Sequence, residues 1–109
     1  MGVPQSERAW IAIVYTVVEQ PRVSRAIDDA KDRWPRAHDA WETISWTLAR
    51  DPQVGKPLTE SGLTRSFTID GARSIGMPTV TVLYAIARFE IMVHDAKFEE
   101  ARFAQAGRG

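Results

Sequence analysis

The residue types best suited to acid–base chemistry lie in the last third of the chain. His94 comes at the end of a β-prone run over residues 89–94. A histidine side chain titrates at about pH 6.5, so it can donate or accept a proton without much help from its surroundings. We therefore predict His94 as a candidate general acid or base, with a merely exposed histidine as the alternative. Strict strand alternation would keep Asp95 on the opposite face, so no histidine–aspartate dyad is implied.

Basic side chains near this histidine could hold a phosphate group. Arg73 and Lys97 are the cations that we predict to bind a reacting phosphodiester through charge-assisted hydrogen bonds. Arg65 and Arg88 could extend this surface for nucleic acid, and Phe98 could stack on a base. The alternatives are a scatter of solvated charges, balanced by nearby carboxylates, and a phenylalanine that packs within its own fold.

The composition limits the kinds of protein that this chain can be. Its 109 residues are 44% apolar and predict a single domain over residues 1–109. Fourteen basic residues balance fourteen acidic ones, which weighs against a free-standing nucleic-acid binder, because such proteins usually carry a basic excess. The sequence has no cysteine and two histidines, which excludes thiol catalysis and disfavours a metal site. It also has no motif for a cofactor.

The apolar run from Trp10 to Val18 is the segment most similar to a membrane anchor or a signal peptide. It has nine residues, whereas a helix that spans a bilayer needs about 20. It also lacks a basic leader and a cleavage site of small residues. We therefore expect a cytoplasmic protein without a membrane segment, and we interpret this run as a strand covered on both faces.

Two helices are predicted after this first strand. Apolar residues with helical spacing form two stripes, separated at Pro35, and predict a helical hairpin. The stripes are Val23, Ala26, Ile27, Ala30 and Trp34, and then Ala37, Ala40, Trp41, Ile44, Trp46, Thr47 and Leu48. A DNA-reading helix-turn-helix is disfavoured, because the second helix offers acidic and aromatic side chains where base-reading ones are needed.

Three more strands follow the helices. Apolar and polar residues alternate from residue 65 to 70, and β-prone runs cover residues 79–87 and 89–94, which predicts a hairpin from the last two. The composition of residues 96–106 favours a short C-terminal helix, ended by Gly107. The order β-α-α-β-β-β is typical of an α+β fold, in which a helical hairpin packs on one face of a small antiparallel sheet.

Three segments of the chain resemble the RelE/ParE superfamily of bacterial toxin–antitoxin toxins. They are residues 48–58 (Leu-Ala-Arg-Asp-Pro-Gln-Val-Gly-Lys-Pro-Leu), 80–84 (Val-Thr-Val-Leu-Tyr) and 94–98 (His-Asp-Ala-Lys-Phe). The resemblance covers about residues 10–105, including the order of helices and strands. It implies the toxin component of a type II pair, of the kind involved in growth inhibition and plasmid stabilisation, which a cognate antitoxin holds inactive.

The superfamily resemblance implies one of two mechanisms, of which we take the endoribonuclease as the leading prediction and inhibition of a target by binding as the alternative. The RelE and YafQ branches are endoribonucleases (mRNA interferases) that cut messenger RNA on the ribosome, and this reading would use the strand-end His94. The ParE branch inhibits DNA gyrase by binding. A catalytically silent binding module and a domain kept only for partner assembly are further alternatives.

The chain departs from the catalytic branches at several positions. Thr81 stands where those enzymes carry an arginine on the third strand, and Thr68 and Asp70 stand near their lysines. Glu90 replaces the arginine that precedes the histidine in the YafQ branch. These substitutions remove positive charge and favour the binding alternative over ribonuclease activity.

Overall fold

The structure, a computed structural model, describes residues 14–102 of the 109-residue chain. The described residues form two α-helices, five strands and two short 3₁₀ helices, and the predicted α+β class is confirmed. In chain order the elements are β1 (Thr16–Glu19), α2 (Pro21–Arg33), α3 (Ala37–Arg50), η1 (Pro52–Val54), β2 (Lys56–Pro57), β3 (Thr64–Ile69), η2 (Arg73–Ile75), β4 (Thr79–Ala87) and β5 (Glu90–Glu99). Neither described helix has the length and apolar character that a membrane crossing requires.

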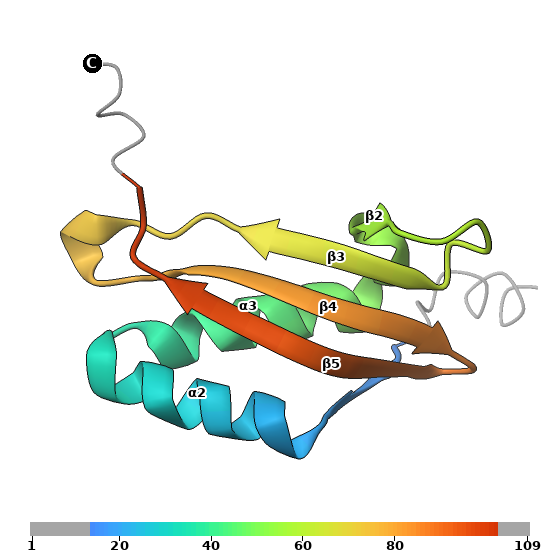
Figure 1. Cartoon of the computed structure of the whole chain (residues 1–109), viewed down its shortest axis with the longest axis horizontal. Coiled ribbons are helices and arrows are strands. Elements are labelled where there is room, and N and C mark those ends of the chain that lie inside the picture. The colour runs from blue at the N-terminus through green and yellow to red at the C-terminus, as the bar shows by residue number, and fades with distance from the viewer. Residues whose placement is uncertain (1–13, 103–109) are drawn as a thin grey trace, which may run out of the picture.

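The described strands form one sheet in the order β1-β5-β4-β3-β2. β1 runs parallel to β5, and the other neighbouring pairs are antiparallel, so the sheet is mixed where an antiparallel one was predicted. Parallel neighbours need a long connection, which the chain from α2 to β4 provides here. Figure 1 shows both helices on the same side of the sheet. No helix of residues 14–102 covers the opposite side, which we call the open face.

Both helices follow the apolar stripes of the sequence. Pro21 begins α2 at a position where its missing N–H costs nothing, and α2 ends before Pro35. The prediction for Trp46 on α3 is wrong, because its side chain is 60% exposed and lies under the guanidinium of Arg50. Two residues beyond Ile44, it is about 200° around the helix from that core position.

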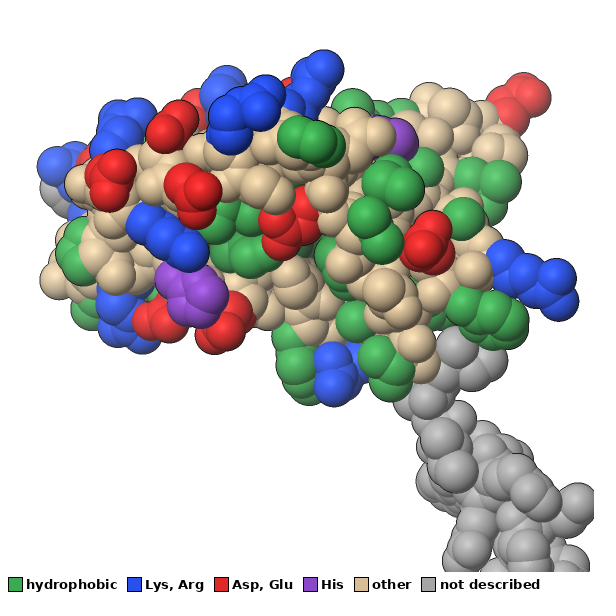
Figure 2. All heavy atoms as spheres, turned by 90° about the horizontal axis from the view of Figure 1, so that it is seen from below, with side chains coloured by type: hydrophobic (Ala, Val, Ile, Leu, Met, Phe, Trp, Pro, Cys, Tyr) green, Lys and Arg blue, Asp and Glu red, His purple; other side chains and the backbone are tan. Residues whose placement is uncertain are grey.

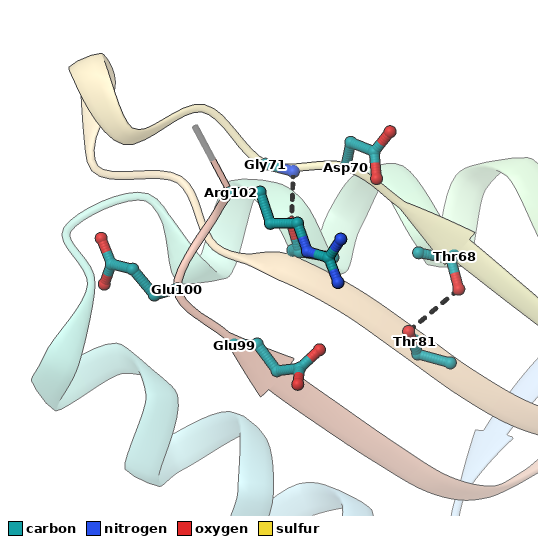
Figure 3. Close-up of a pocket in the computed structure, with 8 residues that line it drawn as sticks. Thr68, Asp70, Gly71, Thr81, Glu99, Glu100 and Arg102 are labelled. Atoms are coloured by element: carbon teal, nitrogen blue, oxygen red, sulfur yellow. Dashed lines mark hydrogen bonds between the residues drawn. The ribbon is translucent and has the colours of Figure 1, made fainter. Parts of the chain in front are cut away.

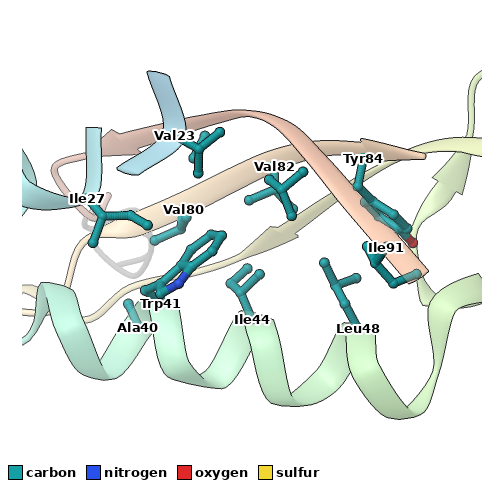
Figure 4. Packing of buried hydrophobic residues seen from close by; sticks show 12 residues of the cluster. Val23, Ile27, Ala40, Trp41, Ile44, Leu48, Val80, Val82, Tyr84 and Ile91 are labelled. Carbon is teal, nitrogen blue, oxygen red and sulfur yellow. The ribbon is translucent and has the colours of Figure 1, made fainter. Parts of the chain in front are cut away.

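The core lies between the helices and the inner face of the sheet (Figure 4). Its members include Val23 and Ile27 from α2, Ala40, Trp41, Ile44 and Leu48 from α3, Val80, Val82 and Tyr84 from β4, and Ile91, Val93 and Ala96 from β5. These core side chains are almost completely buried, so the inner face of the sheet is not accessible. Contacts of the sheet with other molecules must therefore use the open face.

The predicted start of a C-terminal helix at residue 96 is corrected by the structure. Residues 96–99 belong to β5 and not to a C-terminal helix, because they pair with residues 79–82 of β4 and direct Ala96 and Phe98 toward the core. This tertiary pairing outweighs a helix propensity of only a few tenths of a kcal/mol per residue. Residues 103–106 of that predicted helix, and residues 10–13 of the predicted first strand, lie outside the described residues.

Candidate functional site

The open face is the candidate functional surface of the described residues. Its strand residues are Thr16 and Val18 on β1, Lys56 on β2, Thr64, Ser66 and Thr68 on β3, Thr79, Thr81, Leu83, Ala85 and Ala87 on β4, and Glu90, Met92, His94, Asp95, Lys97 and Glu99 on β5. The register places Val18 beside Met92, and Met92 beside Ala85. Together with Leu83 these residues give the face an apolar centre, flanked by the hydroxyl groups of β3.

His94 lies on this face at a β-bulge. Tyr84 pairs with Val93 and Leu83 pairs with Asp95, so His94 is the extra residue of β5. Val93 and the following Ala96 are both buried, and the two residues between them lie on the open side. Strict alternation, our reason for placing Asp95 on the other face, is therefore wrong here. Still, the Asp95 carboxylate accepts a hydrogen bond from the N–H of Ala96 at 3.0 Å, and no hydrogen bond between it and His94 is present among the described residues.

A cleft of about 430 Å³ opens at the end of the open face where β5 ends (Figure 3). It is lined by Thr68, Asp70, Gly71, Thr79, Thr81, Glu99, Glu100 and Arg102. The hydroxyls of Thr68 and Thr81 form a hydrogen bond of 2.9 Å, and the N–H of Gly71 donates to the Thr79 hydroxyl at 2.9 Å. The cleft thus combines three carboxylates and three hydroxyls with a single guanidinium group.

The two cations predicted for phosphate binding are both engaged by carboxylates. The Lys97 ammonium, opposite Thr81 in the register, lies 3.3 Å from Glu99. Arg73 belongs to η2 and lies 3.3 Å from Glu100. Lys97 therefore shares the face with His94, about 10 Å along the strand, whereas Arg73 is at the edge of the cleft. Such exposed pairs contribute about 0–1 kcal/mol each.

The three residues predicted to bind nucleic acid lie apart from His94, Lys97 and the cleft. Arg65 pairs with the inward-facing Tyr84, and its guanidinium donates hydrogen bonds to the backbone carbonyls of Gln53, Gly55 and Gly62. Arg88 lies in the hairpin turn between β4 and β5, next to the Phe89 ring. Phe98 packs against the core. Arg65 therefore stabilises the loops on both sides of β2 and is not free to bind nucleic acid through these donors.

Sequence reasoning missed the cleft residues Glu99, Glu100 and Arg102. It assigned residues 96–106 to a helix, which would have separated these side chains from β3 and β4. The alternation of the buried Ala96, the half-buried Phe98 and the exposed residues around them was the available signal of a strand.

Neither the cleft nor any other place in residues 14–102 gathers three or more histidine, cysteine, aspartate or glutamate side chains that could hold a metal ion. The surface charge is also mixed: Figure 2 shows acidic and basic side chains interspersed over the side of the molecule that carries α2. No continuous basic surface is visible from that side, in keeping with the balanced composition.

A solved structure similar to this one is the toxin–antitoxin complex RelBE2 from Mycobacterium tuberculosis. The match covers 80% of this chain and 93% of the other, with a TM-score of 0.59 and 22% sequence identity. The chain therefore shares its fold with a chain of that toxin–antitoxin complex. The fold that the sequence resemblance implied is thereby confirmed. The sequence matches no protein-family model and no curated protein.

Proposed function

We propose that this chain is the toxin of a type II toxin–antitoxin pair, and that it acts by binding a macromolecular target through the open face. The support for a toxin is the fold shared with a chain of the RelBE2 complex, over most of both chains. The antitoxin would be a protein encoded beside it. The cytoplasm, where such targets lie, is the expected location.

The composition of the open face favours binding over RNA cleavage. With the cleft residues Asp70 and Arg102 included, the face carries four carboxylates outside the Arg73–Glu100 pair and three cations, for a net charge of −1. A phosphate backbone would be repelled by such a surface, whereas nucleic-acid binders gain affinity from cations. Thr81, the residue opposite Lys97, adds a hydroxyl and no charge. This net negative face is the observation that carries the binding mechanism.

Ribonuclease activity is the second candidate function. The observation that favours it is the position of His94 on a bulge of the open face, in the same strand as Lys97. Bulges redirect side chains and are frequent beside active sites. In this mechanism His94 would act as general acid or base, with Lys97 and Arg73 on the phosphate after exchange of their carboxylate partners.

Induction of the chain in a bacterial host separates the two functions. The wild type, His94→Ala and His38→Ala would be expressed, growth would be followed, and messenger RNA would be mapped for new 5′ ends. His38 is the matched control, because it is exposed on α3 and pairs with Glu42 at 3.1 Å, away from the open face. The binding mechanism predicts growth arrest by all three proteins without new ends.

New 5′ ends that fall by about two to four orders of magnitude with His94→Ala alone would establish the ribonuclease instead. Undisturbed growth, despite accumulation of folded wild-type protein, would refute the toxin function itself. A supercoiling assay with purified DNA gyrase then tests whether gyrase is the target.

A further inference from the structure

We propose that the open face receives a segment of the antitoxin that combines apolar side chains with arginine or lysine, and that a basic side chain of this segment enters the cleft beside Asp70. The inference rests on the proposed toxin function and adds the chemistry and the place of the partner. The expected partner is basic at this contact, since the surface that it covers is acidic.

The centre of the open face supplies the apolar half of this site. Val18, Leu83, Ala85 and Met92 are half-buried and come from three adjacent strands. The register puts Val18, Met92 and Ala85 in one row across the sheet, and Leu83 in the next row. A sheet of this kind commonly faces water with a polar surface, so a contiguous apolar centre indicates an interaction surface. Apolar side chains of a partner would remove it from water.

The cleft supplies the polar half. Among the described residues the Asp70 carboxylate has no hydrogen bond or ion pair, although it lines the cleft. Within residues 14–102 Glu99 is paired only with Lys97, whose side chain is 71% exposed, so this pair can be exchanged at little cost. The hydroxyls of Thr68 and Thr81 offer further acceptors nearby. Guanidinium and ammonium groups, which carry donors only, match such a set of acceptors.

Arg102 leaves room for a second cation in this cleft. Figure 3 shows its side chain extending over the cleft between Asp70 and Glu99. Its guanidinium nevertheless forms no ion pair with a carboxylate among the described residues. The Asp70 carboxylate therefore keeps its capacity to accept hydrogen bonds. The cleft volume of about 430 Å³ lies in the range of clefts that bury ligand groups.

Charge decides between a protein segment and a nucleic acid as the occupant. The net charge of −1 on the open face opposes a phosphate backbone and favours a basic peptide. Apolar residues at the centre of the face likewise suit aliphatic side chains, because bases would be expected to find aromatic or cationic stacking partners. Both observations point to a protein.

The test uses the full chain and the protein encoded by the adjoining reading frame, with the dissociation constant measured by calorimetry at low and high salt. The double variant Asp70→Asn/Glu99→Gln removes two cleft carboxylates and keeps their shapes. Asp32→Asn/Glu60→Gln is the matched control, because both residues are exposed and neither lines the cleft, the first lying on α2 and the second in the loop between β2 and β3. Leu83→Asn tests the apolar centre, with circular dichroism to verify folding.

The inference predicts binding weakened by about tenfold or more in the cleft variant, with a flatter salt dependence, and by a similar factor in Leu83→Asn. The control should stay within about twofold. A complex with unchanged affinity in both open-face variants would overturn the inference and leave the toxin function standing. Failure of the wild type to form any complex or to arrest growth would refute both the inference and the toxin function. If the wild type binds a short single-stranded RNA and Leu83→Asn abolishes this binding, the inference is overturned and the open face is a nucleic-acid surface.

Discussion

The hydroxyl of Tyr84 holds the loop between α3 and β3, and its removal should destabilise the fold. Tyr84 is fully buried, donates a hydrogen bond to the carbonyl of Pro52 at 2.6 Å and accepts one from the N–H of Gly55 at 3.0 Å. Gly55 is itself buried, and a Cβ atom there would lie 2.6 Å from the Tyr84 hydroxyl. The substitution Tyr84→Phe deletes one oxygen atom and breaks both contacts without changing the packing of the ring.

The size of the effect follows from the two backbone groups left behind. A buried donor or acceptor without a partner costs about 1–3 kcal/mol. Pro52 is only half-buried, so water can satisfy its carbonyl in part. We therefore expect a loss of about 2 kcal/mol, mainly from the N–H of Gly55. For a chain of 109 residues the unfolding entropy converts this loss into a Tm lower by about 9 °C.

Urea unfolding, followed by tryptophan fluorescence and far-ultraviolet circular dichroism, measures this loss. Tyr15→Phe is the matched control, since the chain has two tyrosines and the Tyr15 hydroxyl forms no hydrogen bond among the described residues. The control should change the free energy of unfolding by less than about 0.5 kcal/mol. Equal midpoints for the two variants, with unchanged m values, would refute the reasoning, because the loop would then not depend on this hydroxyl.

Two further predictions concern the stability of the fold. Burial raises the pKa of Tyr84 above its usual value of about 10, partly offset by the hydrogen bond from Gly55. The folded protein therefore keeps a proton that the unfolded chain loses, so this contribution to stability is complete below about pH 10 and declines above it. The stability gap between wild type and Tyr84→Phe should accordingly narrow in urea titrations above that pH. Separately, Phe89 has a φ of 58° and is 54% exposed, so Phe89→Asn should raise the free energy of unfolding by up to about 1 kcal/mol. A lower midpoint would instead show that its contact with Tyr15, 6.2 Å between ring centroids, outweighs the backbone strain.

The elements with a clear periodicity could be predicted from the sequence. The spacing of Val23, Ile27 and Ala30 predicts the buried side of α2, and alternation after residue 65 predicts β3. These signals are local, because a helix or strand exposes the same face at a fixed interval. The end of β5 was not predictable in this way, since residues 96–99 have helix-forming composition and become a strand only by pairing with β4.

For the candidate site, the sequence predicted the types of residue and not their arrangement. His94 and Lys97 were identified by residue type, and they share the open face. Arg65 was assigned to the same group, but it lies in register with the buried Tyr84 and binds backbone carbonyls. The side on which a strand residue lies depends on the core that its neighbours enter, and Arg65 lies on the same side of β3 as Phe67 and Ile69, which pack against the core.

The sequence by itself determined the α+β order of the elements, the balanced charge and the absence of thiol chemistry. Only the tertiary structure decided which residues meet on the open face. The bulge at His94 shifts the register of β5 by one residue, so that Ala96 and Phe98 turn inward, and Lys97 and Glu99 turn outward, where Glu99 shares the cleft with Asp70. Such a shift arises from pairing between distant segments, and a one-residue slip reverses the side on which every following side chain lies.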